Sequence, residues 1–176
     1  MAAEPPLTPA HFAAEVQRLA GATFAADEPI AIAVSGGADS LALLWLSARA
    51  YGARAHVLTV DHGLRTASAV ECAQVMAVAS AEGLPATTLP LGLSTHANVQ
   101  EAARNARYAA MANQCAALGI RFLLTGHHRD DQAETLLMRL ARGSGLAGLS
   151  GIRAVSPMAG VTLLRPLLGH SRTAEA

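Results

Sequence analysis

Short apolar runs alternate along the chain with longer stretches in which apolar residues recur at helical spacing. Four runs of small or β-branched residues suit buried strands, at 30–34, 55–60, 85–91 and 120–125. Helical patterns precede, separate and follow them, at 8–20, 41–52, 67–83, 98–119 and 130–142. Strands that alternate with helices favour βαβ units. The sequence therefore predicts a Rossmann-like α/β fold, with a doubly wound, mostly parallel sheet and helices on both faces.

The segment Ser35–Ser40, SGGADS, separates the first predicted strand from the next helix. Two glycines let the backbone approach a phosphate closely, and the following helix N-terminus offers N–H groups with partial positive charge. The hydroxyls of Ser35 and Ser40 add donors at the two edges. A Gly-Gly pair here also suits a plain tight connection, and SGGADS matches neither of the commonest nucleotide loops. The strand–turn–helix arrangement nevertheless predicts phosphate binding by Ser35, Gly36, Gly37, Ala38, Asp39 and Ser40.

Polar side chains also follow the other predicted strands. Asp61 and His62 come after the second strand, and Gly126-His127-His128-Arg129-Asp130-Asp131 comes after the fourth. Ligands of doubly wound sheets bind beyond the carboxyl ends of the strands. Asp131 and Glu134 are three residues apart and share one helix face. We therefore expect four side chains to converge on one catalytic site: Asp39, His128, Asp131 and Glu134.

Simpler readings exist for the same residues. Asp130 suits a helix N-terminus, and His127 and His128 could form hydrogen bonds that end a strand. Histidines beside aspartates also suit a transition metal. Adjacent side chains point apart, however, and no HExxH pattern is present, so no transition metal is expected. Magnesium, which prefers carboxylate and phosphate oxygens, is the expected metal, with Asp39 and Asp131 as its ligands.

Composition and charge indicate what forms the core and whether the whole surface favours nucleic acid. Of 176 residues, 52% are apolar and only 3% aromatic, which predicts a core of Ala, Leu and Val. The formal charge is zero, with 13 basic residues, all of them Arg, against 13 acidic ones. This balance gives no global argument for nucleic-acid binding. We expect an N-terminal helix and lead-in over 1–27 and one ligand-binding domain over 28–176.

No segment suggests a membrane or secretory protein. No apolar run approaches the ~20 residues that span a bilayer, and the N-terminus lacks the basic and apolar regions of a secretory signal. Cys72 and Cys115 lie far apart in helical patterns, as expected for buried thiols in a reducing compartment. We therefore expect a cytoplasmic protein.

SGGADS resembles the S-G-G-x-D-S loop of the N-type ATP pyrophosphatases, the PP-loop family, which split ATP between its α- and β-phosphates. Within that family, GHHRDDQAETLLMRLARGSGLAGLSGI at 126–152 resembles the signature of tRNA(Ile)-lysidine synthases. VDHGLR at 60–65, EAARNARYAAMA at 101–112 and LLRPLL at 163–168 are similar to the same group, in the same order. The resemblance covers about 30–172.

The resemblance implies a ligase that uses ATP and Mg²⁺. Members adenylate C2 of the wobble cytidine of tRNA(Ile) with a CAU anticodon, and L-lysine then displaces AMP to form lysidine. Carried onto this chain, Ser35–Ser40 would hold the phosphates and Asp39 would orient the loop and metal. His128, Asp131 and Glu134 would line the place where base, metal and amine meet. One of them would remove a proton from lysine.

Further residues are candidates for substrate or tRNA contact: Asp61, His62, Arg104, Arg107 and Arg142. Arg104 and Arg107 suit phosphate recognition, but they could equally pair with Glu101 on a solvated helix face. Arg142 could lie over the cytidine or simply form a basic helix end. Family members continue past LLRPLL with further core sequence and usually tRNA-binding domains. The chain therefore resembles a truncated form that carries the nucleotide-binding domain.

Three hypotheses follow. The first is an ATP-dependent tRNA-modifying ligase domain. The second is another PP-loop enzyme that acts on a different acceptor, although the tRNA-thiolating branch typically has cysteine pairs, which this sequence lacks. The third is a nucleotide-binding module that does not catalyse because its partner half is missing.

Overall fold

The computed structural model describes residues 6–63, 66–91, 99–141 and 151–171. Its helices are α1 (Pro9–Ala20), α2 (Ala38–Tyr51), α3 (Thr66–Ala81), α4 (Val99–Ala117) and α5 (Arg129–Ala141), with a short 3₁₀ turn η1 (Gly52–Arg54). Its strands are β1 (Ile30–Ala33), β2 (Ala55–Asp61), β3 (Ala86–Pro90), β4 (Phe122–Thr125), β5 (Val155–Met158) and β6 (Val161–Leu164). Every helix and strand predicted from the sequence is present, with ends displaced by a few residues.

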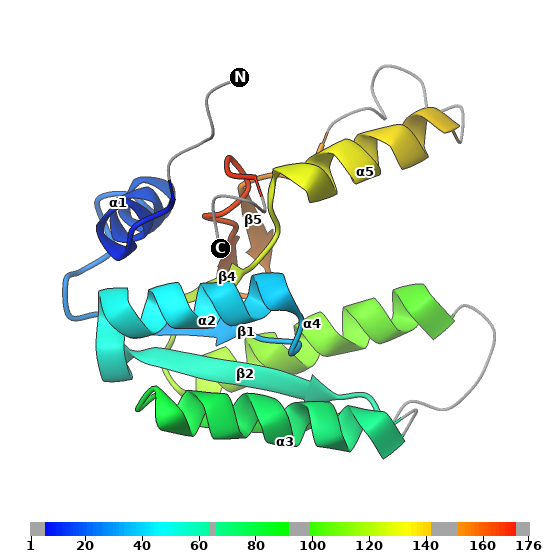
Figure 1. Ribbon diagram of the computed structural model, residues 1–176, viewed down its shortest axis with the longest axis horizontal. Helices are drawn as coiled ribbons and strands as arrows, with labels where there is room; N and C mark the ends of the chain where they lie inside the picture. The colour runs from blue at the N-terminus through cyan, green and yellow to red at the C-terminus, as the bar shows by residue number, and fades with distance from the viewer. Residues whose placement is uncertain (1–5, 64–65, 92–98, 142–150, 172–176) are drawn as a thin grey trace.

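One six-stranded sheet runs through the molecule in the order β3-β2-β1-β4-β6-β5 (Figure 1). All neighbouring pairs are parallel except β5 with β6. From β1 the chain moves outward to β2 and β3, and it then crosses to the other side of β1 to form β4. The order of strands therefore reverses between β1 and β4, which is the point where doubly wound sheets bind ligands. The predicted fold class is confirmed.

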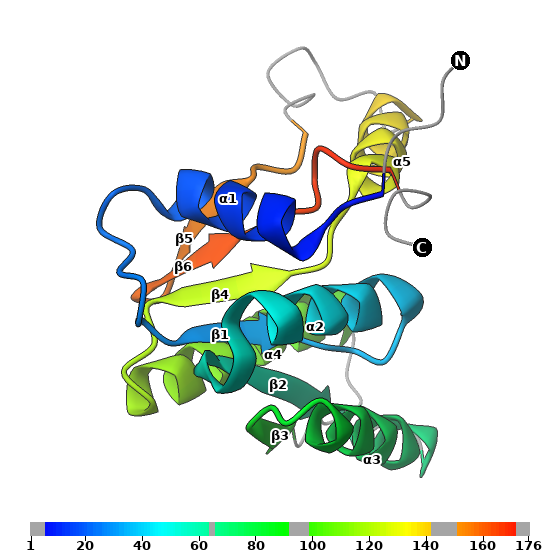
Figure 2. The ribbon, with the colours of Figure 1, turned by 60° about the vertical axis from the view of Figure 1, so that its left-hand side comes forward.

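The strands bury side chains on both faces. Ile30 and Ile32 of β1 lie in one core cluster with residues of α1, α2 and α3, whereas Ala31 lies in the other, with Met111 and Cys115 of α4. Figure 2 shows α2 and α4 on opposite sides of the sheet. This alternation follows from the two-residue period of a strand. Because helices cover both faces, polar groups of the central strands are accessible chiefly at the strand ends.

Helix α1 packs on the same core as the rest of the fold. Thr8 caps it, accepting a hydrogen bond from the backbone N–H of His11, and Pro9 occupies its first turn. Phe12 and Val16 are fully buried in the cluster that contains the helix α2 residues. The predicted division of the chain at residues 27 and 28 remains a prediction.

A β-hairpin at one edge of the sheet, formed by β5 and β6, was missing from the sequence prediction. Ala159 and Gly160 connect the strands, and both have positive φ, as a two-residue type I′ turn requires. Ala-Gly is a weak turn signal, and Ser156 and Pro157 interrupt the apolar run of β5. Pro157 lies in the outer strand β5, where its missing N–H breaks no ladder bond with a further strand.

Helix α5 extends away from the sheet (Figures 1 and 2) and buries none of its residues. Within the described ranges, no helix has the length and apolarity needed to cross a bilayer.

Candidate functional site

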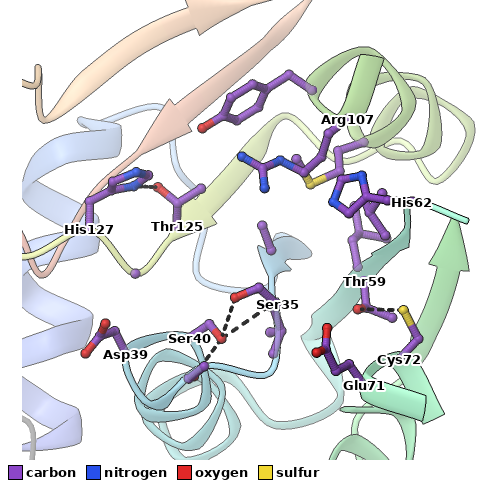
Figure 3. Close-up of a pocket in the computed structure, with 18 of the residues that line it drawn as sticks. Ser35, Asp39, Ser40, Thr59, His62, Glu71, Cys72, Arg107, Thr125 and His127 are labelled. Carbon is purple, nitrogen blue, oxygen red and sulfur yellow. Dashed lines mark hydrogen bonds between the residues drawn. The ribbon is translucent and has the colours of Figure 1, made fainter. Parts of the chain in front are cut away.

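A cleft of about 360 Å³ opens at the carboxyl edge of the sheet, beside the ends of β1, β2 and β4 (Figure 3). Its polar lining residues are Ser35, Asp39, Ser40, Thr59, His62, Ser68, Glu71, Arg107, Tyr108, Thr125, His127 and Asp131. Apolar side chains, among them Val34, Leu58 and Met111, form the rest of the wall. A cleft with an apolar wall and convergent polar groups suits a nucleotide, whose base is flat and weakly polar and whose phosphates are charged.

The β1–α2 turn is held by hydrogen bonds among its own residues. Ser40 Oγ donates to the Gly37 carbonyl at 2.8 Å and accepts from the Ser35 backbone N–H at 3.2 Å, and it lies 3.3 Å from Ser35 Oγ. Gly36 has φ +89°, a conformation that L side chains rarely adopt. The predicted six-residue loop is therefore a closed, locally bonded turn at the bottom of the cleft.

Helix α2 begins inside this six-residue segment, at Ala38, with Gly37 as its N-cap. Gly37 has no side chain that could satisfy the N–H groups of the first helical turn. Those groups and the positive end of the helix dipole are therefore left for an anion in the cleft. Ser35, Gly37 and Ser40 line the cleft, whereas Gly36 and Ala38 do not.

His128 links helix α5 to the β1–α2 turn. Its Nδ1 accepts a hydrogen bond from the Asp130 backbone N–H at 3.2 Å, and its own backbone N–H donates to Asp131 Oδ2 at 2.8 Å. This reciprocal pair has the form of a capping box at the start of α5. Because Nδ1 accepts, the neutral ring carries its proton on Nε2. That Nε2 lies 3.4 Å from Asp39 Oδ2.

The structure thus brings Asp39, His128 and Asp131 together, although two segments about ninety residues apart in sequence supply them. His128 is 2% exposed and does not line the cleft. Glu134 is exposed on α5 and is also absent from the lining. Arg142 lies outside the described residues.

His127 lines the cleft where the sequence analysis had selected its neighbour His128 (Figure 3). Its Nδ1 lies 2.9 Å from Thr125 Oγ1. Burial lowers the pKa of His127 to about 4, and the positive charge of Arg165 acts in the same direction. The imidazole is therefore uncharged at neutral pH. Two adjacent histidines at a strand–helix junction look equivalent in sequence, and only the N-cap role of His128 distinguishes them.

Gly126 is a site residue that the sequence reasoning did not select. A Cβ added there would lie 2.8 Å from the Asp39 carbonyl oxygen. This distance is shorter than real Cβ contacts, so only glycine permits the β4–α5 and β1–α2 turns to touch. A glycine directly after a buried strand and before a polar cluster was the available signal.

At the end of β2, Asp61 organises a turn. Its Oδ1 accepts from the Gly63 backbone N–H at 2.9 Å and from Ser68 Oγ at 2.7 Å, and these bonds lower the pKa of the Asp61 carboxyl. Ser68 Oγ also accepts from the His62 backbone N–H at 3.2 Å. Asp61 does not line the cleft, whereas His62 does, and His62 Nδ1 is buried with no hydrogen-bond partner within the described residues. Asp61 therefore positions His62.

Helix α4 contributes Arg107, Tyr108 and Met111 to the opposite wall. The guanidinium carbons of Arg104 and Arg107 lie 5.3 and 5.5 Å from the Tyr108 ring centroid. Both arginines thus flank one aromatic ring, and Arg107 lines the cleft while Arg104 does not. Figure 3 shows the Arg107 side chain directed toward the cleft from α4.

The carboxylates of Asp39 and Asp131 could bind magnesium together with phosphate oxygens. Asp39 and Asp131 contact opposite ring nitrogens of His128, with Asp131 Oδ2 at 3.5 Å from Nδ1, and both aspartates line the cleft. The described residues contain no group of three or more His, Cys, Asp or Glu side chains that could hold a metal alone. One or two carboxylates completed by phosphate oxygens are a usual magnesium environment. The site therefore fits a metal that arrives with the phosphates.

Comparison with known proteins gives consistent matches. The model of the PP-loop domain matches residues 9–174. A tRNA(Ile)-lysidine synthase from Novosphingobium aromaticivorans is 51% identical over 146 residues, which make up 81% of this chain and 45% of that protein. A tRNA(Ile)-lysidine synthase from a Bradyrhizobium species is 48% identical over 166 residues, or 91% of this chain and 46% of that protein. The chain spans about half the length of these relatives.

Two solved structures share the fold at low sequence identity. The U34-tRNA thiolase NcsA from Methanococcus maripaludis, described with its 4Fe-4S cluster, superposes with a TM-score of 0.74 at 16% identity. That match covers 94% of this chain and 61% of the thiolase. The NH₃-dependent NAD synthetase from Campylobacter jejuni has a TM-score of 0.61 at 13% identity, over 95% of this chain and 68% of the synthetase.

Proposed function

The chain belongs to the PP-loop family, and on that basis we propose that it binds ATP in the cleft, with the phosphates against Ser35–Ser40. The supporting geometry is the uncapped start of α2 together with the hydroxyl of Ser35, both in the lining of the cleft. The adenine would lie against the apolar wall formed by Val34, Leu58 and Met111.

We further propose that this ATP adenylates C2 of the wobble cytidine of tRNA(Ile) with a CAU anticodon, and that L-lysine then displaces AMP to form lysidine. The observation that carries this reaction is the 51% identity to a protein named tRNA(Ile)-lysidine synthase, over 81% of this chain. The chain spans about half of that relative.

Two bond exchanges make up the reaction. The cytidine O2 attacks the α-phosphorus, and pyrophosphate leaves with the electron pair of the broken P–O bond. An amine of lysine then attacks C2, and AMP leaves with the C2–O2 pair. Negative charge grows on the α-phosphate and pyrophosphate oxygens, so donors fixed before reaction stabilise the transition state. N–H groups of α2 and the Arg107 guanidinium are the donors available in the cleft.

The acidic residues and the histidines have different roles in the proposed reaction. Asp39 and Asp131 would hold Mg²⁺, which when bound neutralises phosphate charge. His128 holds the Asp131 carboxylate through its backbone N–H, and its Nε2 lies 3.4 Å from Asp39 Oδ2. Glu134, one helical turn from Asp131, is the candidate proton acceptor for the lysine amine. His127 is uncharged and lines the cleft, and its pKa of about 4 makes it a weak base suited to hydrogen bonding with the substrate. His62 and Arg107 are the candidates for contact with the base or its ribose-phosphate.

Incubation of the chain with ATP, L-lysine and tRNA(Ile) tests the proposal. AMP and pyrophosphate release that depends on both lysine and this tRNA is the expected result. AMP release with a different acceptor would replace lysidine formation by another PP-loop reaction. ATP binding without turnover under any of these conditions would leave a nucleotide-binding module.

A matched pair of variants tests the placement of ATP. Gly36→Val forces a branched residue into the positive-φ position of the turn, and we expect it to abolish ATP binding. Gly169→Ala is the control, because a Cβ at Gly169 meets nothing within 4 Å. Unchanged ATP affinity in folded Gly36→Val would overturn the placement.

A further inference from the structure

A second cavity of about 350 Å³ lies between α4 and the β5–β6 hairpin. Asn105, Tyr108 and Ala109 line it from α4, and Ser156, Pro157, Met158, Ala159, Leu163 and Arg165 line it from the hairpin and the residue that follows. Tyr108 also lines the nucleotide cleft, so the two cavities share one wall. The role proposed for the nucleotide cleft leaves this second cavity unexplained.

Arg165 is the unusual residue of this cavity. It lies in the LLRPLL segment, directly after β6, and is only 7% exposed. Its Nη1 donates to the Arg153 carbonyl at 2.5 Å and to Ser156 Oγ at 3.1 Å. Its Nε is buried and has no hydrogen-bond partner in the part of the chain that the structure describes. A guanidinium has five N–H donors, so this side chain has capacity left for a ligand.

Positive charge gathers around the same wall. Arg104 and Arg107 flank the Tyr108 ring, and Arg165 is close enough to Tyr108 to interact with its hydroxyl. Among the described residues, none of these three arginines forms an ion pair with Asp or Glu. A buried charge costs free energy unless a counter-charge or hydrogen bonds compensate it. A bound anion would supply that counter-charge.

We propose that this cavity is a phosphate subsite, in which Arg165, Tyr108 and Asn105 bind the oxygens of a phosphate group. Arginine, tyrosine, asparagine and serine are side chains that commonly contact phosphate in nucleic-acid complexes, and they are the polar residues of this cavity. The apolar residues Pro157, Met158 and Leu163 leave room for an attached sugar. The cavity is far larger than a bare phosphate requires.

Two sources of phosphate fit this chemistry. One is a phosphodiester of an RNA whose target base lies in the neighbouring cleft, and this source rests on the proposed function. The other is free inorganic phosphate or pyrophosphate. We favour the RNA backbone because the shared wall at Tyr108 places the subsite next to the cleft where the base would react.

The experiment follows the NMR signal of the Arg165 side chain itself. Nitrogen-15 NMR of the arginine Nε–H groups of the 176-residue chain is recorded during titration with inorganic phosphate and, separately, with an RNA hairpin that carries a CAU anticodon loop. A shift of the Arg165 signal with both ligands supports the proposal. A shift with phosphate alone keeps the subsite but assigns it to the free ion and overturns the RNA source. No shift with either ligand overturns the proposal.

Variants separate this subsite from general charge effects. Asn105→Ala removes an exposed lining amide and leaves the hairpin contacts of Arg165 intact, whereas Arg165→Lys keeps the charge but loses the planar fork. We expect each to weaken RNA-hairpin binding about 3- to 10-fold, the usual worth of one hydrogen bond. Arg49→Gln is the control, since Arg49 stacks on Trp45 and pairs with Glu82 elsewhere on the surface. Equal weakening by the control would overturn the proposal.

Failure of the subsite and failure of the proposed function give different results. The Arg165 signal and the binding constants need no turnover, so they test the subsite even if the chain modifies no RNA. Lysine-dependent AMP release, in contrast, tests the function whether or not Arg165 responds to phosphate. ATP affinity, measured for every variant, should stay within about twofold of wild type for Asn105→Ala.

Discussion

The two turns that form the bottom of the cleft differ in how far their stabilising contacts reach along the chain. The β1–α2 turn is held by hydrogen bonds among residues 35, 37 and 40, all within six positions of sequence. The β4–α5 turn combines local bonds of His128 with distant partners: the Arg129 backbone N–H donates to His170 O at 2.8 Å, and Gln132 bonds the backbone of Ile152. The shape of a turn with only local bonds can be read from its sequence, whereas the distant partners of the second turn cannot.

Because of this difference, substitutions in different parts of the chain should disturb the two turns. The β1–α2 turn should respond to changes within itself. The β4–α5 turn should respond to changes wherever its partners lie, including the point where the two turns touch. The following predictions run from the largest expected effect to the smallest.

Gly126→Ala should have the largest effect, because its new Cβ would lie 2.8 Å from the Asp39 carbonyl and would push the two turns apart. We expect a loss of stability of about 1–3 kcal/mol from overpacking, and a fall in ATP-dependent turnover of about 10²-fold from misplaced groups. Urea unfolding and AMP release measure the two effects. Gly169→Ala, where a Cβ meets nothing within 4 Å, is the control. Wild-type turnover in Gly126→Ala would show that the contact between the turns is dispensable.

The His127 imidazole should make stability depend on pH. Its pKa is about 4 in the folded chain against 6.5 for an ordinary histidine, so between these values the unfolded state binds more protons. The contribution is therefore complete above pH 6.5 and lost as the pH falls toward 4, with an upper bound of about 3 kcal/mol. Unfolding of wild type and His127→Gln at pH 7 and pH 4.5 measures it. Parallel pH dependence in both proteins would contradict the burial of this ring.

Ser40→Ala should cost about 1–2 kcal/mol and weaken ATP binding, because the Ser35 N–H loses its acceptor and the Gly37 carbonyl loses one of its two donors. Ser47→Ala on the same helix is the control. Ser47 Oγ is buried without a hydrogen-bond partner among the described residues, so its removal should be neutral or slightly stabilising. Thermal unfolding and ATP titration of both variants test the pair. Equal stability losses would mean that the hydroxyl bonds of Ser40 do not hold the turn.

Gln132→Leu should cost about 1 kcal/mol, because the Gln132 amide donates to Ile152 O at 2.7 Å and accepts from Ile152 N at 2.6 Å. Turnover should fall several-fold more than this stability loss explains, since Asp131 is the preceding residue of the same helix turn. Gln17→Leu is the control, because the Gln17 amide also bonds backbone carbonyls, of Gly21 and Phe24, but on α1. A similar fall in turnover for both would show that Gln132 has no particular link to the site.

The fold could be predicted largely from the sequence, because most of its helices and strands can be recognised from their own residues. Apolar runs and helical spacing recur over whole elements, and the parallel arrangement follows from their alternation, so each element is identified without knowledge of its neighbours. The β5–β6 hairpin was missed because Ser156 and Pro157 interrupt the apolar run of β5 and its Ala159-Gly160 turn is an unusual one. The site roles assigned to Asp39, His128, Asp131 and Glu134 remain predictions.

The sequence by itself determined the β1–α2 turn, because the hydrogen bonds and the positive φ that shape it belong to residues 35–40 alone. Only the tertiary structure decided which of the two adjacent histidines faces the cleft. That choice depends on the N-cap of α5, on the approach of Asp39 and on the close contact that Gly126 permits. The last two of these contacts join residues far apart in the chain, and no local pattern records which distant groups will meet.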